Sequence, residues 1–387
     1  MARKIIAVIV LFLILTPLLM WLGWLLTPKT KLVAAVVDKT VVSPGNQEHI
    51  SLNWVLNHNR FTVTSERPYD IDQDYFGFFP MENQQFKIKG LERFSDDQLN
   101  RLSQDSDMVY FTDTYGVHSM EWYGTEDKKG HIGMLYGGLS NEDLQFMENM
   151  KARHKLILAE FNTIGSPTHT SNRKKFENLF GLKWTGWTAR YFNDLDLVRN
   201  KEIPAWLISN YKKSHKGEWP FTRAGLAFVN DKDQVVILEE GRHLENALPF
   251  IHPTDEARKK WGLPEKVKYP FWFDIMEPDL KVNTLDASFR LSLLVEGKQE
   301  LAVYGIPESF PAVTRHSGKD YRFYYFSGDF SDNPVGENSS YFKGIGFFKG
   351  FFYDDRDPLE RGSFFWNFYR PMITHILKDE VRLLESH

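Results

Sequence analysis

The stretch that decides the fold is HKLILAEFNTIG, residues 154–165. Its apolar run, KLILAEF, has the length and composition of a strand that is buried on both faces. The run ends at Glu160, and Asn162 and Gly165 follow directly. An α/β enzyme places its ligands and reactive groups at the carboxyl ends of such strands. Glu160 is therefore a candidate catalytic group, and the alternative is a structural acid bonded to loop amides.

Two similar strands precede this stretch, and helices separate them. Residues 32–37 form an apolar run that ends at Asp38, and residues 108–114 form another that contains Asp113. A further strand is predicted at 61–64. Strands that alternate with helices predict an α/β fold in which a parallel sheet is flanked by helices. The predicted helices cover residues 48–59, 96–104, 141–154 and 172–182, with Ser140 and Ser171 as caps.

The pattern changes after residue 182. Strand-like runs separated by turns follow one another without long helices, and residues 299–306 (QELAVYGI) are read as one of these strands. The predicted organisation has an α/β domain at 32–245 and a β-rich, aromatic C-terminal region at 246–387. This second region is either separate or packed on the same domain.

The N-terminus predicts a membrane anchor. Residues 5–26 form an apolar run without charge, and this run is long enough for a transmembrane helix. No small-residue cleavage site follows it. Residues 1–31 are therefore expected to form an uncleaved signal anchor that makes the lipid bilayer a partner. The expected location is the cell membrane, single-pass, with the bulk of the chain extracytoplasmic.

The composition excludes several classes of protein. The formal net charge of −4 gives no basic footprint for nucleic acid. The chain has no cysteine, which excludes disulfides, thiolate metal sites and a cysteine nucleophile. Nucleotide-binding, zinc-protease and serine-hydrolase motifs are also absent from the sequence. No metal or cofactor is predicted.

The predicted strand ends define one candidate site. The carboxyl ends of parallel strands share one edge of a sheet, so acids at these ends should meet in one crevice. Glu160 and Asp113 are the candidate catalytic pair, and a structural role in turns is the alternative for each. The ligand-binding candidates at the strand ends and in the loops after them are Asp38, Glu48, His49, Tyr115, His118, Asn162 and His169.

Residues 136–162, YGGLSNEDLQFMENMKARHKLILAEFN, resemble the core of the class I glutamine amidotransferase-like (flavodoxin-like) superfamily. Gly137, Gly138 and the helix after them match the family's layout, in which a strand then runs into a sharp nucleophile elbow. Active members carry cysteine at the elbow, whereas residues 160–162 of this chain are Glu-Phe-Asn. The resemblance therefore implies the fold without amidotransferase activity. It also implies a bacterial envelope protein, because non-catalytic relatives handle sugars and envelope polymers.

Aromatic and acidic clusters suggest what the crevice binds. Trp184, Trp187 and Arg190 lie in one segment, WTGWTARYF, where the rings could stack on sugars or belong to the core. Asp329 and Asp332 in SGDFSDNP could bind a cation, act as acid and base on a sugar, or form a plain turn.

Three functions follow from these features. The first is an anchored protein that binds carbohydrate or assists the synthesis or export of envelope polysaccharide. The second is a glycoside hydrolase that uses Glu160 and Asp113. The third is a scaffold that docks a membrane protein through its aromatic C-terminal tail, where residues 341–353 combine Phe, Tyr and Gly with two lysines.

Overall fold

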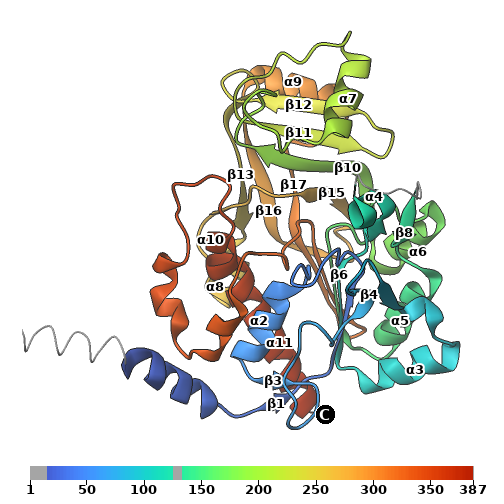
Figure 1. Cartoon of the computed structure of the whole chain (residues 1–387), viewed down its shortest axis with the longest axis vertical. Helices are drawn as coiled ribbons and strands as arrows, with labels where there is room; N and C mark the ends of the chain where they lie inside the picture. The colour runs from blue at the N-terminus through green and yellow to red at the C-terminus, as the bar shows by residue number, and fades with distance from the viewer. Residues whose placement is uncertain (1–14, 125–132, 387) are drawn as a thin grey trace, which may run out of the picture.

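The computed structural model describes residues 15–124 and 133–386, and a ten-stranded mixed sheet forms its centre (Figure 1). Five neighbouring strands are parallel, and the strands on both outer sides of them are antiparallel. Across the sheet the order is β14 (Val267–Lys268), β13 (Leu244–Pro253), β16 (Thr284–Leu293), β17 (Ser309–Ser317), β18 (Arg322–Phe326), β9 (Leu156–Glu160), β6 (Met108–Asp113), β2 (Ala34–Asp38), β4 (Phe76–Pro80) and β5 (Phe86–Lys89).

The predicted parallel sheet is therefore wrong as a fold class. The parallel strands β2, β6 and β9 lie where the sequence placed them, but β18, from the C-terminal region, pairs in parallel with β9. The antiparallel strands β17, β16, β13 and β14 then extend the same sheet. Strands from both sides of the proposed boundary at residue 245 thus share one sheet.

Helices cover both faces of this sheet (Figure 1). On one face lie α3 (Asp96–Asp105), α5 (Asn141–Ala152) and α6 (Thr170–Phe180), and on the other lie α2 (Ile50–His58), α8 (Asp255–Trp261) and α11 (Arg370–Glu385). The alternation of side chains along β2 shows why both faces need cover. Val36 packs into the core that contains α2 and α11, while Val37 packs into the core that contains α5 and α6.

The cap of α5 matches the prediction. The Ser140 hydroxyl accepts a hydrogen bond from the Asp143 N–H at 3.0 Å, and the Asp143 carboxylate accepts one from the Ser140 N–H at 2.8 Å. This reciprocal pair satisfies two donors at the helix start and fixes where α5 begins. The cap of α6 is His169 rather than the predicted Ser171.

A four-stranded antiparallel sheet lies beyond one end of the central sheet, at the top of Figure 1. Its order is β12 (Val235–Glu239), β11 (Gly225–Asn230), β10 (Leu182–Phe192) and β15 (Phe273–Pro278), with α7 (Ala205–Ser214) and α9 (Val295–Val303) nearby. Residues 299–306, predicted as a strand, begin inside α9 and are mostly helical, so that prediction is wrong. Smaller elements are β1 (Thr30–Lys31), β3 (Phe61–Thr62), β7 (Val117–His118), β8 (Met134–Tyr136), α4 (Ser119–Tyr123), α10 (Gly362–Phe364), the 3-10 helices Leu91–Arg93, Glu337–Tyr341 and Ile345–Phe351, and a π-helical turn Phe365–Tyr369.

The predicted strand at 61–64 has a different place. Residues 61–62 form β3, which pairs with β1 in a separate two-stranded sheet. The position beside β2 in the central sheet belongs instead to β4.

The predicted membrane span is corrected by the structure. Among residues 15–124 and 133–386, no helix combines the length and the apolar character needed to cross a bilayer. The span was placed at residues 5–26, of which 5–14 lie outside the described residues, and the described helix covers 15–25. Its end packs on the folded body, because the Trp24 indole N–H donates to the Asn57 carbonyl at 3.0 Å. The single-pass membrane location depended on this span and is corrected with it.

Gly116 provides a test of the packing beside β6. It has φ +90°, and a Cβ added there would lie 2.1 Å from the Tyr136 carbonyl oxygen. We expect Gly116→Ala to lower the free energy of unfolding by about 3 kcal/mol or more in urea denaturation. Gly217 is the matched control, since it has φ +83° and no atom within 4 Å of its added Cβ. Gly217→Ala should cost only about 1–2 kcal/mol of backbone strain, and equal losses would contradict the packing.

Candidate functional site

Three acids end neighbouring parallel strands at one edge of the central sheet. Asp38 ends β2, Asp113 ends β6 and Glu160 ends β9. All three side chains are buried. The strands therefore place the acids side by side, while their roles in binding or catalysis stay predictions.

Glu160 uses both carboxyl oxygens in hydrogen bonds. The Tyr110 hydroxyl donates to Oε2, and the Ser331 N–H donates to Oε1 at 3.1 Å, where the Ser331 hydroxyl also bonds. Burial raises the pKa of Glu160 well above its ordinary value, and these hydrogen bonds oppose that rise. With no exposed surface, the carboxyl group ties β9 to the loop around Ser331 and faces no open space. This geometry favours the structural alternative.

Asp113 is held in the same way. It accepts hydrogen bonds from the Thr40 hydroxyl at 2.7 Å, the Tyr115 N–H at 2.5 Å and the Asn162 side-chain amide at 3.2 Å. Burial raises the pKa of Asp113 to about 7, against the effect of these three donors. The predicted residues Tyr115 and Asn162 thus lie at Asp113, where they order the loops after β6 and β9.

Asp38 positions the start of α2. Its Oδ2 lies 2.7 Å from the His49 Nδ1 and accepts a hydrogen bond from the Glu48 N–H at 2.9 Å. His49 is buried, whereas Glu48 is only half-buried. Asp38 therefore fixes the backbone from which the Glu48 side chain extends.

A second acidic group lies near the three acids at the strand ends. Carboxylate oxygens of Glu48, Asp329 and Asp332 all lie within 4.8 Å of one another. Asp329 is only 5% exposed, and among the described residues its Oδ1 has no hydrogen-bond partner. The Asp332 carboxylate pairs with Arg361 at 3.0 Å, and Arg361 also donates to the Asp332 carbonyl at 2.6 Å.

The electrostatics of this group differ from those of an ordinary turn. Burial raises the pKa of Glu48 well above its usual range, and the charges of Asp332 and Asp329 raise it further. Burial likewise raises the pKa of Asp329, with Asp332 and then Glu160 adding to the rise, while Arg361 opposes it. These carboxyl groups therefore favour a shared proton or a cation over full ionisation.

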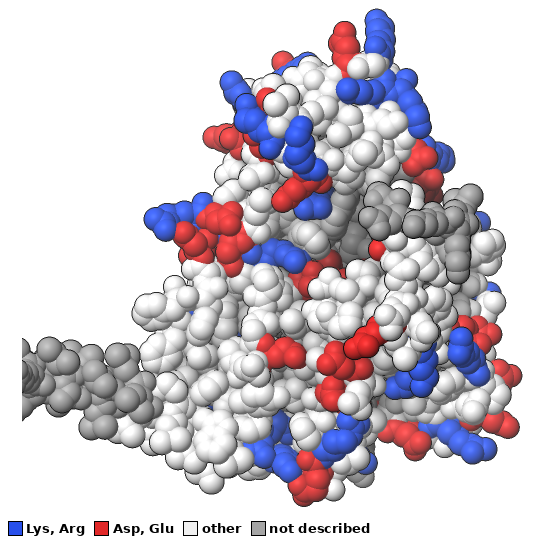
Figure 2. Space-filling view, viewed as in Figure 1, with Lys and Arg blue, Asp and Glu red and all other residues white. Residues whose placement is uncertain are grey.

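Aromatic and guanidinium groups border the acids. The Arg361 guanidinium lies 3.9 Å from the centre of the Phe271 ring. Arg190, on β10, lies 5.2 Å from the same ring and 5.6 Å from the Trp272 ring. All four side chains are half-buried. They connect the four-stranded sheet to the acidic group, and Figure 2 shows acidic side chains in a hollow of this face below that sheet.

The remaining predicted residues lie elsewhere. Trp184 and Trp187 are 7% and 6% exposed and belong to the hydrophobic core, so their ring faces are covered. His169 is an exposed cap of α6 that bonds Ser171 at 2.7 Å. His118 is half-buried with its ring 4.9 Å from the Tyr115 ring. A sugar-binding role for the two tryptophans stays a prediction that their burial does not favour.

Sequence reasoning missed the association of Glu48 with Asp329 and Asp332. The last two were recognised as a candidate pair, and Glu48 was assigned to a different part of the crevice. The missing signal was the pairing of β18 with β9, which brings the 327–334 loop to the edge where β2 ends. Three carboxylates this close have the oxygen ligands that Ca²⁺ or Mg²⁺ prefers.

Comparisons with known proteins show remote similarity of fold. No protein-family model and no curated protein matches the chain. A β-galactosidase from Bacillus circulans sp. alkalophilus is 11% identical, with a TM-score of 0.26, over 59% of this chain and 21% of the other. The carbohydrate deacetylase Agd3 is 7% identical, with a TM-score of 0.32, over 77% of this chain and 29% of the other. This chain therefore covers less than a third of either protein.

A third similar structure covers most of both chains. It is a ThuA-like protein from Bacteroides uniformis ATCC 8492, 10% identical with a TM-score of 0.33, and the similarity covers 88% of this chain and 95% of the other. ThuA-like proteins are thus among the structural neighbours of this chain, at low identity. The similarity is too remote to carry an activity to this chain.

The buried acids predict a distinctive pH dependence of stability. Burial raises the pKa of both Asp113 and Asp274 to about 7 in the folded chain, against about 3.9 when unfolded. The folded state therefore binds more protons between these values, and stability falls as pH rises from about 4 to about 7. Each group contributes a slope of up to about 1.4 kcal/mol per pH unit. Urea denaturation across this range measures the slope.

Asp113→Asn should make that slope shallower, because it removes one titrating group and keeps the side-chain shape. The exposed Asp97 offers a control, and Asp97→Asn should leave the slope unchanged. Stability that rises with pH through this window would show that the buried acids are ionised in the folded state.

Proposed function

We propose that the chain acts on carbohydrate and that Glu48 and Asp329 cleave a glycosidic bond. The observation that carries this proposal is the buried, unpartnered oxygen of Asp329 beside Glu48. The acids at the strand ends have donors for their carboxylates, as a structural role requires. Within the described part of the chain Asp329 Oδ1 lacks such a donor, and perturbed acids of this kind concentrate at functional sites.

The environment of each carboxyl group assigns its role. Glu48 has Asp332, Asp329, Asp113 and Asp38 around it, all of which favour its protonated form, so it is the general acid. Burial raises the pKa of Asp329 as well, but the Arg361 guanidinium opposes that rise, so we assign the proton to Glu48 and the role of nucleophile to Asp329. The separation of at most 4.8 Å between their oxygens is nearer to the approximately 5–5.5 Å of retaining glycosidases than to the wider spacing of inverting ones.

The reaction follows from these roles. Glu48 gives its proton to the glycosidic oxygen as the bond to the anomeric carbon breaks, and Asp329 forms a bond to that carbon. Glu48 then takes a proton from water, whose oxygen displaces Asp329 and releases the sugar. The Arg361–Asp332 pair holds the loop that carries Asp329. Phe271 and Trp272 supply ring faces for a sugar, and the half-buried Arg190 supplies donors for its hydroxyls.

A second candidate function is cation binding by the same three carboxylates. Carboxylate oxygens of Glu48, Asp329 and Asp332 lie within 4.8 Å of one another, which concentrates negative charge and favours a bound cation. The Arg361 guanidinium offsets part of that charge. A divalent cation would remove the mutual repulsion of the three groups. The two functions differ in what they require: hydrolysis needs a mobile proton on Glu48, and cation binding needs all three groups ionised.

The test of hydrolysis uses aryl glycosides and a panel of soluble polysaccharides, with released reducing ends as the measurement. We expect Glu48→Gln and Asp329→Asn each to lower kcat about 100-fold to 10,000-fold, since each removes a proton donor or a nucleophile. Glu82→Gln is the surface control and should retain activity. Thermal unfolding of every variant checks that it folds. Absence of turnover by the wild type on every substrate, or full activity in Glu48→Gln, would overturn the proposal.

Isothermal titration with CaCl₂, MgCl₂ and MnCl₂ separates the two functions. Cation binding predicts a site that Glu48→Gln and Asp329→Asn weaken at least tenfold and that weakens below about pH 6, because protons compete for the same carboxylates. The proposed hydrolysis predicts turnover that persists in EDTA. Tight binding of a cation together with loss of turnover in EDTA would favour the second candidate.

A further inference from the structure

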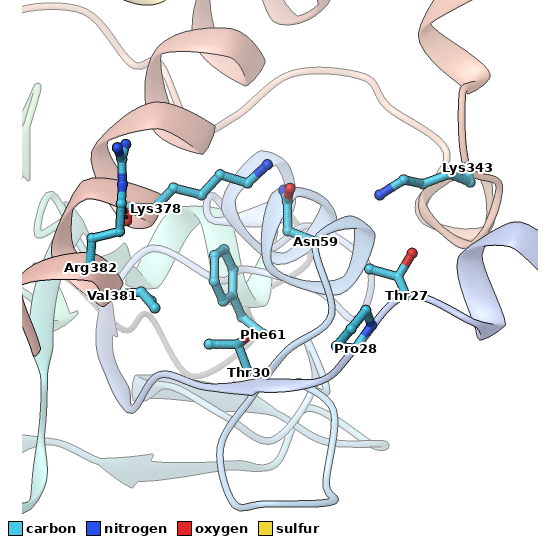
Figure 3. Close-up of a pocket in the computed structure, with 9 residues that line it drawn as sticks. All are labelled: Thr27, Pro28, Thr30, Asn59, Phe61, Lys343, Lys378, Val381 and Arg382. Carbon is cyan, nitrogen blue, oxygen red and sulfur yellow. Dashed lines mark hydrogen bonds between the residues drawn. The ribbon is translucent and has the colours of Figure 1, made fainter. Parts of the chain in front are cut away.

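We propose that a basic pocket at the opposite end of α2 binds a phosphoryl group. The pocket has a volume of about 380 Å³ and opens between the C-terminal end of α2, the start of β1 and one side of α11 (Figure 3). Its lining residues are Thr27, Pro28, Thr30, Asn59, Phe61, Lys343, Lys378, Val381 and Arg382. Three of these are cations and none is an acid.

The two lysines lack counter-charges. Within residues 15–124 and 133–386, neither the Lys343 nor the Lys378 amine has a carboxylate within 4.0 Å or a hydrogen-bond partner, whereas Arg382 pairs with Asp379. Figure 3 shows the lysine side chains extending toward Asn59 from opposite sides of the pocket. An anion between the two amines would meet both of them, while the Asn59 side-chain N–H is donated to the Val55 carbonyl at 2.8 Å.

The cations around the pocket repel one another. Burial lowers the pKa of Lys378, and the charges of Lys343 and Arg382 lower it further. His58, in the last turn of α2, has a pKa lowered to about 4, mainly by burial, with Arg370, Lys343 and Lys378 adding to the effect. The acid on the facing side of α11, Glu380, is buried in a bidentate pair with Arg322 and is not available to these lysines.

The shape of the pocket limits the ligand. Phe61, Val381 and Pro28 form apolar walls, and Thr27, Thr30 and Asn59 provide hydroxyl and amide groups. A phosphoryl group has several strong acceptor oxygens and a charge near −2 as a monoester, which suits two lysine amines. The apolar walls leave room for a small organic group attached to the phosphate. A free phosphorylated molecule and a phospholipid headgroup share this chemistry.

The experiment measures binding to the full chain by isothermal titration with inorganic phosphate and with glycerol 3-phosphate. Co-sedimentation with vesicles of phosphatidylcholine, alone or mixed with phosphatidylglycerol, forms a second arm. We expect saturable binding in one arm that Lys343→Gln/Lys378→Gln weakens at least tenfold and that added salt weakens further. Binding to the soluble phosphates identifies a free ligand, whereas binding only to the mixed vesicles identifies a headgroup.

Two further variants keep this test decisive. Lys174 is an exposed lysine on α6, so Lys174→Gln removes one lysine charge away from the pocket and should leave binding unchanged. Lys343→Arg/Lys378→Arg retains the charges and should retain binding, which separates charge from folding. No binding in either arm, or equal loss in Lys174→Gln, would overturn the proposal. Glycoside hydrolysis is independent of this pocket, so its presence or absence does not bear on the result.

Discussion

The hydrogen bonds between Glu160 and Ser331 hold together two distant parts of the chain. Glu160 ends a strand of the N-terminal half, and Ser331 lies in the loop after β18, so the carboxyl group joins segments that are 171 residues apart. The Ser331 hydroxyl also bonds the Glu48 carbonyl at 2.8 Å. One buried acid therefore fixes the positions of both Glu48 and the Asp329–Asp332 loop. Loss of this link would separate the acidic group even if every strand stayed in place.

The edge of the sheet concentrates negative charge at a cost to stability. Each buried carboxyl group loses solvation, and the resulting rise in pKa means that folding favours the protonated acid. Glu160 and Asp113 reduce this cost through hydrogen bonds from hydroxyl, amide and backbone donors. Asp329 has no such compensation at Oδ1 among the described residues. An uncompensated polar group of this kind is what a ligand-binding site retains when stability alone would remove it.

Local patterns in the sequence predicted much of the central sheet. Apolar runs that end in acids identified β2, β6 and β9, and the Ser140 cap identified the start of α5, because these features depend on neighbouring residues. The pairing of β18 with β9 depends on residues far apart in the chain, and no local pattern encodes it. The same distance hid the approach of Glu48 to Asp329. The strand prediction at residues 299–306 failed for another reason: an apolar run of this length suits a strand or a helix, and tertiary packing decided for α9.

The end of the uncharged N-terminal run packs on the folded body. Hydropathy alone assigned Trp24 to a membrane span, whereas its indole bonds α2 and its ring lies 4.9 Å from the Tyr341 ring. A tryptophan with an apolar body and one polar donor suits a half-buried contact with the protein surface as well as a membrane interface. The sequence contains no feature that distinguishes these two environments.

The helix α2 connects the two charged sites electrostatically. Its nine residues, Ile50–His58, place the acidic group before its N-terminus and the lysine pocket beside its C-terminus. A helix dipole stabilises negative charge at the first end and positive charge at the second, typically by about 0.3–1 kcal/mol each. Both clusters carry the sign that the dipole favours. This attraction offsets part of the repulsion within each cluster, and the helix separates the two clusters by about 14 Å at 1.5 Å per residue. That separation keeps the acids and the lysines from pairing with one another.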